Sequence, residues 1–176
     1  MYALVMSRIA EILVVRGDTG EALRIREEIE LVECERTHDD RCKGQALVAI
    51  AEILIEQGQP DRALRRIEGE LVPLVDRLDD TSLQAQARTW QADALHRLGR
   101  TQRAVRLVRD EIVPRYRDLG DEQGEAIAVS LLADIDADAG RVDAAIKTMR
   151  EKVLPAFRRG THKLNIVRGQ FQLADM

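Results

Sequence analysis

Aromatic residues are scarce in this chain: Phe, Trp and Tyr make up only 3% of its 176 residues. The core must therefore be built mainly from aliphatic side chains. An excess of one charge is also missing, because 27 Lys and Arg are interleaved with 31 Asp and Glu for a net charge of −4. This excludes the one-sided basic surface of a general nucleic-acid binder, so we expect no nucleic-acid partner.

Long apolar runs are absent as well. No stretch approaches the roughly 18 residues needed to cross a bilayer, and the start MYALVMSRIAE meets an acid too early for a secretory signal. We therefore expect a cytoplasmic protein with no membrane partner. Because thiols in that compartment are more often free than bonded, we also expect both cysteines to be free.

Signatures of catalysis and of metal binding are missing too. The chain has no GxxxxGK[ST], GxSxG or HExxH motif. A run of alternating aspartates resembles a calcium loop, but its glycine, Gly140, comes one residue late and Ala145 stands where a Glu is needed. No second ligand lies at metal-binding spacing from any histidine, namely His38, His96 and His162. We predict no enzyme, no cofactor and no metal site.

What the sequence does contain is a repeat with a step of 41 residues. Turn glycines recur at this step, and so do two columns of alanine. The glycines are Gly17, Gly58, Gly99 and Gly140; the alanines are Ala10, Ala51, Ala92, Ala133 and Ala174 in one column and Ala22, Ala63, Ala104 and Ala145 in the other. A fixed period of about 20 to 50 residues indicates a solenoid, in which each unit buries its apolar face against the next.

Each unit reads as two helices joined by a tight turn. Apolar residues recur three and four apart, as in Ile9, Ile12 and Leu13, which is the spacing of one helical face. The glycine ends the first helix, and the alanines let the two helices approach closely. Prolines should bend or break the later second helices, whereas the first unit has Val32 and its second helix should be straighter; the prolines are Pro73, Pro114 and Pro155. Cys34 shares its column with Val75, Tyr116 and Phe157, so we expect it in the core.

These columns resemble the tetratricopeptide repeat family over essentially the whole chain. The match lies in both alanine columns and in the apolar residue before the first of them, which is Ile9, Ile50 and Leu132 but Gln91 in the third unit. The usual period of 34 residues is exceeded. The longer second helices are similar to those of kinesin light chains, and the block GDTGEALRIREEIELVE is similar to repeats of bacterial signalling proteins.

The predicted fold class is therefore all-α: a right-handed α-solenoid of antiparallel helix pairs, with four repeats and a final helix. We place the repeats at 3–43, 44–84, 85–125 and 126–166, with a partial fifth at 167–176, in a single domain over 1–176. The resemblance implies a scaffold for protein–protein interaction with a concave groove lined by the first helices.

One acid per unit follows the alanine of the first helix and would face that groove: Glu11, Glu52, Asp93, Asp134 and Asp175. Such a column would suit a basic peptide or a partner domain with lysine and arginine side chains. Alternatively, each acid pairs with an arginine of a neighbouring helix and only fixes the repeat geometry. The other predicted groove residues are Ser7, Val48, Thr89, Ser130, Ile55 and His96.

A column of bases follows the second helices: Arg24, Arg65, Arg106 and Lys147. It is interpreted as a solvated outer face, with phosphate binding as the alternative. The first helix offers Val5, Met6 and Ile9 where a terminal repeat normally has a polar cap. The alternative function is therefore a structural or self-assembling array, or a sensor segment of a larger protein, that stacks through its helix ends.

Overall fold

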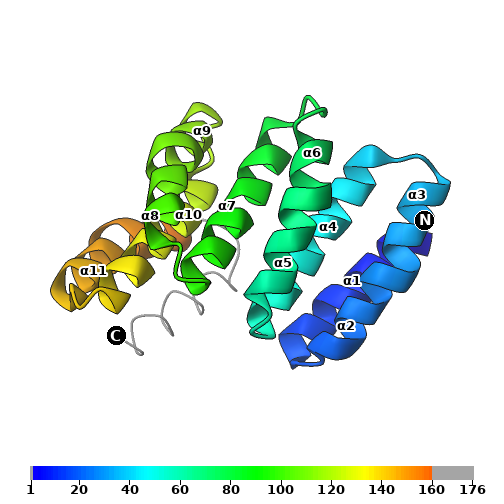
Figure 1. The fold of residues 1–176 in the computed structure, drawn as a ribbon, viewed down its shortest axis with the longest axis horizontal. Helices are drawn as coiled ribbons and strands as arrows, with labels where there is room; N and C mark the ends of the chain where they lie inside the picture. Colours follow the sequence, from blue (N-terminus) through cyan, green and yellow to red (C-terminus); the bar gives the residue numbers. More distant parts are fainter. Residues whose placement is uncertain (1, 160–176) are drawn as a thin grey trace. The chain divides into compact units, whose positions relative to one another are not determined.

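The computed structural model describes residues 2–159, which form helices joined by short turns and include no strand (Figure 1). The all-α prediction is therefore confirmed. The chain divides into two compact units, Met1–Leu98 and Gly99–Met176. The handedness of the solenoid and the single-domain organisation stay predictions. The expected fifth repeat, 167–176, lies outside the described residues.

In the first unit, each first helix is one α-helix and each second helix is a run of three consecutive segments. The first pair is α1 (Tyr2–Arg16) with α2 (Thr19–Ile25), η1 (Arg26–Glu30) and α3 (Leu31–Arg36). The second is α4 (Asp40–Glu56) with α5 (Pro60–Arg66), η2 (Ile67–Leu71) and α6 (Val72–Val75), and α7 (Thr81–Arg97) follows. α4 packs on its own second helix and also on α2, η1 and α3 of the preceding pair.

The second unit begins with a second helix made of α8 (Thr101–Arg106), η3 (Leu107–Ile112) and α9 (Val113–Asp118). α10 (Glu122–Asp138) is a first helix, and its partner consists of α11 (Val142–Thr148), η4 (Met149–Val153) and α12 (Leu154–Arg159). α10 packs on η3 and α9, which precede it in the sequence, and on α11, η4 and α12, which follow it.

The turns follow the repeat. All four turn glycines have positive φ, between 70° and 91°, a conformation that costs little only without a Cβ. A second set of turn residues was not singled out from the sequence: Asp39, Asp80 and Asp121 also recur at 41 residues. Each accepts a 2.9 Å hydrogen bond from the backbone nitrogen three residues on and so caps α4, α7 or α10.

The eight alanines of the two columns in the described residues are all fully buried, with no exposed surface. The expectation that these columns serve packing is therefore confirmed. Large apolar side chains such as Ile50, Leu54 and Ile67 are also fully buried in the first unit, and Met149 and Val153 form one buried cluster with Ala133 and Ala145 in the second. The core is mostly aliphatic, as the low aromatic content requires.

A π-helical segment interrupts every second helix, including the first, where the proline position is occupied by Val32. That the second helix of the first unit is straighter than the others stays a prediction. In the later repeats proline is the second residue of α6, α9 and α12, directly after the π segment. Because η1 forms without a proline, the proline ring is not what causes the wide turn.

Candidate functional site

The predicted acidic column lies on successive first helices. Glu11 is on α1, Glu52 on α4 and Asp93 on α7 in the first unit, and Asp134 is on α10 in the second. Glu11 is exposed and the other three are half-buried. Asp175 lies outside the described residues. All four described acids are thus at least partly accessible to solvent.

Two of these acids form ion pairs with arginines of their own helix. Glu11 lies 2.7 Å from Arg8, and Asp93 lies 2.8 Å from Arg97. Arg26 of the neighbouring segment η1 is farther from Glu11, at 3.9 Å. For Glu11 and Asp93, the shortest pair is therefore within the helix and does not bridge two repeats.

Four of the six predicted groove residues outside the acidic column are buried, and the other two are half-buried, as most of the acids are. Ser7 and His96 are half-buried. Thr89 and Ser130 are buried, and their hydroxyls donate hydrogen bonds to the backbone carbonyls one turn earlier. The aliphatic members, Val48 and Ile55, are buried as well, at 9% and 2% exposure. These last four side chains have little or no exposed surface to offer a partner.

The column of bases lies on exposed parts of the second helices. Arg24 pairs with Glu21 at 2.7 Å and with Glu28 at 3.1 Å, and Arg65 pairs with Asp61. The hydrogen bond from Arg24 lowers the pKa of the Glu21 carboxyl, and the two acids raise the pKa of Arg24. Arg24 and Arg65 are thus partly neutralised along their own helix, as on a solvated face.

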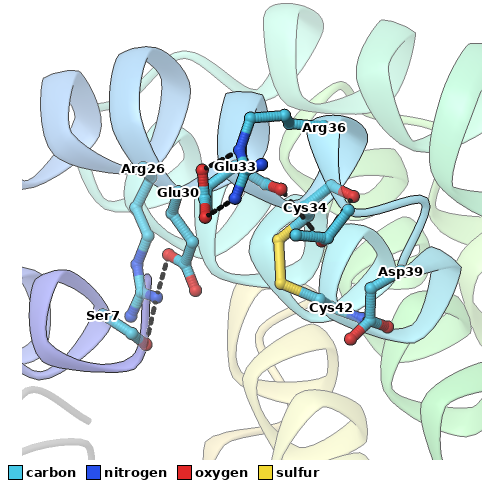
Figure 2. Close-up of a disulfide and its surroundings, with 9 residues drawn as sticks. Ser7, Arg26, Glu30, Glu33, Cys34, Arg36, Asp39 and Cys42 are labelled. Carbon is cyan, nitrogen blue, oxygen red and sulfur yellow. Dashed lines mark hydrogen bonds and ion pairs between the residues drawn. A yellow bond between two sulfur atoms is a disulfide. The ribbon is translucent and has the colours of Figure 1, made fainter. Parts of the chain in front are cut away.

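A buried ion pair lies between α1 and the second helix of the first repeat (Figure 2). Arg26 and Glu30 are each only 6% exposed, and Nη1 of Arg26 donates to Oε2 of Glu30 at 2.5 Å. The same nitrogen donates to Oγ of Ser7 on α1 at 2.7 Å, while Nε of Arg26 has no hydrogen-bond partner among the described residues.

The repeat makes this pair unusual. In the other repeats the two positions hold buried apolar residues, which are Ile67 and Leu71, Val108 and Ile112, and Met149 and Val153. Sequence reasoning missed the pair, although comparison of the columns carries the signal: a charge of each sign, one helical turn apart, stands in two otherwise apolar columns.

Cys34 and Cys42 form a disulfide between the end of α3 and the first turn of α4 (Figure 2). The expectation of free thiols is therefore wrong, whereas the expectation that Cys34 is in the core is confirmed at 1% exposure. The expectation rested on compartment alone, and it is the short turn that brings the two Cα atoms to 5.5 Å. Disulfides are uncommon in cytosolic proteins, so the cytoplasmic location stays a prediction.

The corresponding contact has a different chemistry at each later turn. Val75 and Leu83 replace the cysteines at the next turn, and both side chains lie within 4 Å of the position that a Cβ on Gly44 would take. At the third turn Tyr116 faces Gly124, whose missing side chain makes room for the ring. One packing position is thus satisfied by a covalent bond, by two aliphatic side chains, and by a large residue against a small one.

Reduction of the disulfide is expected to lower the free energy of unfolding by about 2 to 3 kcal/mol, because it frees an eight-residue loop in the unfolded chain. The measurement is urea unfolding with and without a reductant. The C34V/C42L variant, which has the residues of the next turn, is the control, and its midpoint should not respond to the reductant. An unchanged midpoint for the native chain would contradict the prediction.

The described residues meet neither the requirements of a metal site nor those of a membrane-spanning helix. Among residues 2–159, no three His, Cys, Asp or Glu side chains are grouped so as to hold a metal ion. The aspartate run from Asp134 to Asp138 is part of helix α10. His162 lies outside the described residues. No helix in the described part of the chain is both long enough and apolar enough to span a membrane.

Comparison with known proteins gives one family. A sequence model described as "Tetratricopeptide repeat" matches residues 44–68 and 85–110. The first match covers most of α4, the turn glycine Gly58, α5 and the start of η2. A search of curated proteins gave no match.

Proposed function

Because this chain is a tetratricopeptide repeat protein, we propose that it is an interaction scaffold whose first helices bind basic side chains of a partner protein or peptide. Tetratricopeptide repeats generally mediate protein–protein interaction or scaffolding. The observation that carries the finer proposal is the acidic column, in which one partly exposed carboxylate recurs at the same position of α1, α4, α7 and α10.

A basic side chain of a partner could replace the arginine that Glu11 or Asp93 already pairs with. The side chains of Arg8 and Arg97 are 72% and 50% exposed. The pair of Arg8 and Glu11 is exposed at both side chains, and such a pair contributes about 0 to 1 kcal/mol, so a lysine or arginine of a partner can replace Arg8 at little cost. The column can therefore remain charged and folded in the free protein and still be available to a ligand.

A single acid in each repeat spaces the charges by one structural unit. A basic segment that lies along several first helices would meet them in succession, and the attraction would speed association at low ionic strength. The apolar members of the predicted groove, Val48 and Ile55, are buried on α4, which favours recognition mainly by charge at that helix. The proposal assigns no role in catalysis to any residue.

Neutralising the column is expected to weaken binding of basic peptides by about tenfold or more at low salt, because several modest charge interactions are lost together. The variant carries E11Q, E52Q, D93N, D134N and D175N. The control carries E28Q, E70Q, D110N, D143N and E151Q, an equal charge change on exposed acids of the second helices. The probes are peptides selected on the native chain from a random display library, with affinity measured over a salt series.

Selected peptides should be rich in lysine and arginine, and the column variant should lose both affinity and salt dependence while the control keeps them. Selected peptides without such enrichment, or equal affinity for both variants, would contradict the proposal. The same two variants used as bait in a native cell extract would then identify the natural partner.

A further inference from the structure

Helix α1 has an apolar face that no described part of the chain covers. Its large hydrophobic side chains are 39 to 66% exposed: Leu4, Val5, Ile9, Ile12 and Val15. The other exposed large hydrophobics of the described residues, Val32, Leu119 and Ile127, lie on three different segments. Apolar surface gathered on one helix indicates a contact surface.

Part of this face is the surface that repeats use to pack on one another. Ile9 is 39% exposed and Ile12 66%, whereas their equivalents on α4, Ile50 and Ile53, are 0% and 1% exposed. α4 differs from α1 in having the second helix of a preceding repeat packed against it. A preceding repeat would therefore account for Ile9, Ile12 and Val5.

A preceding repeat would not cover the side chains of Leu4 and Val15. Their equivalents on α4 are Gln45 and Glu56, and both are exposed although a preceding repeat is in place. On α7 the equivalents are Gln86 and Arg97, also exposed. The apolar face of α1 is thus wider than repeat stacking requires, so its occupant reaches positions that stacking leaves in solvent.

The wider part of the face is self-complementary. Leu4, Arg8, Glu11 and Val15 follow one another at spacings of four, three and four residues and so form a single stripe on the helix. When two such helices run antiparallel about a two-fold axis between Ile9 and Ala10, Leu4 meets Val15 of the second copy and Arg8 meets Glu11 of the second copy. Both side chains of this charge pair are free to turn outward, at 72% and 49% exposure.

We propose that two copies of this chain pair through α1, antiparallel, with Leu4 against Val15 and Arg8 against Glu11 across a two-fold axis. An isologous interface needs a patch that complements itself, and this stripe does so in both charge and hydrophobicity. The pairing is independent of the proposed peptide site apart from Glu11, which belongs to both surfaces. The tests therefore change only apolar residues.

The first test is molar mass against concentration by light scattering and sedimentation. The molar mass of the native protein should rise with concentration from that of one chain to that of two chains, and no further. The L4Q/V15E variant has the residues that α4 carries at these two positions. Its dimer dissociation constant should be at least about tenfold higher than that of the native chain. The control L119Q/I127E, with the same types of change at exposed sites elsewhere, should pair like the native chain.

Three results would overturn the proposal: a native chain that is monomeric at all concentrations, equal pairing by L4Q/V15E, or a mass that keeps rising beyond two chains. The last result would indicate open-ended stacking of repeats instead. Circular dichroism of L4Q/V15E checks that the helices remain, which the exposure of both positions predicts.

The second test reads out the direction of pairing. With L4C and V15C together, mild oxidation should give a covalent dimer, because each new cysteine faces the other one on the second copy. L4C alone or V15C alone should not, because like positions lie about 16 Å apart along an antiparallel pair. The two native cysteines are already joined to each other. Efficient cross-linking of either single variant would contradict the antiparallel arrangement.

Discussion

Replacing Arg26 with alanine is expected to lower the free energy of unfolding by about 3 to 5 kcal/mol. The change leaves the Glu30 carboxylate 6% exposed without its nearest cation, and it removes the partner of the Ser7 hydroxyl. Leaving a buried charge without its partner lowers the free energy of unfolding far more than removing one partner of an exposed ion pair. The measurement is urea unfolding followed by circular dichroism.

The repeat provides the matching replacement. In the second repeat, Ile67 and Leu71 occupy the positions of Arg26 and Glu30, and Val48 occupies that of Ser7. The R26I/E30L variant, with or without S7V, is therefore expected to be at least as stable as the native chain and up to about 4 kcal/mol more stable, because desolvation of two charges is avoided. R26A, E30L and R26A/E30L complete a double-mutant cycle.

An exposed arginine two positions earlier serves as the control. Arg24 has its side chain half exposed in its ion pairs, so R24A should change stability much less than R26A. If R26I/E30L proved less stable than R26A, the buried pair would be contributing specific stability that apolar packing cannot replace. The interpretation of Arg26 and Glu30 as a replaceable pair would then be wrong.

Replacing Gly124 with leucine is expected to lower the free energy of unfolding by about 3 kcal/mol or more. A Cβ at Gly124 would lie 2.2 Å from Cε1 of Tyr116 and 2.8 Å from Oδ2 of Asp121, the residue that caps α10. Tyr116 is 3% exposed, so its ring has little room to move away. This steric cost exceeds the gain of about 1 kcal/mol in helix propensity.

The second turn again indicates the compensating change. Y116V alone should cost about 2 to 4 kcal/mol through the cavity it leaves, whereas Y116V/G124L reproduces the pair Val75 and Leu83. We expect the double variant to recover most of the stability lost by either single one. The control G20L adds the same side chain where nothing lies within 4 Å and should not destabilise. Additive losses in Y116V/G124L would show that the two positions are not coupled.

Much of the local structure could be predicted because each feature depends on neighbours in sequence. The turn glycines have the positive φ that their spacing indicated, and the helical phase of the aspartate run follows from the repeat. The caps Asp39, Asp80 and Asp121 could have been found in the same way, since they recur at the same step. The alanine columns were interpreted correctly because a small residue kept at a fixed position records a close contact.

The candidate site was harder to predict because burial depends on several elements at once. Val48 and Ile55 belong to columns that were expected to line a groove, yet both are buried by residues from other segments. Glu11 and Asp93 were expected either to bind a ligand or to bridge repeats, and each forms an ion pair of 2.7 or 2.8 Å with an arginine of its own helix. A column shows that positions are equivalent, but it does not show how much solvent reaches them.

The sequence by itself determined the 41-residue unit, its two helices and the position of each turn, because these follow from periodicity and from the conformational freedom of single residues. Only the tertiary structure decided which side chains meet across a turn or between helices: the disulfide of Cys34 and Cys42, the ion pair of Arg26 and Glu30 beneath Ser7, and the room that Gly124 leaves for Tyr116. Such contacts depend on distances and rotamers that differ from repeat to repeat, although the backbone positions are equivalent.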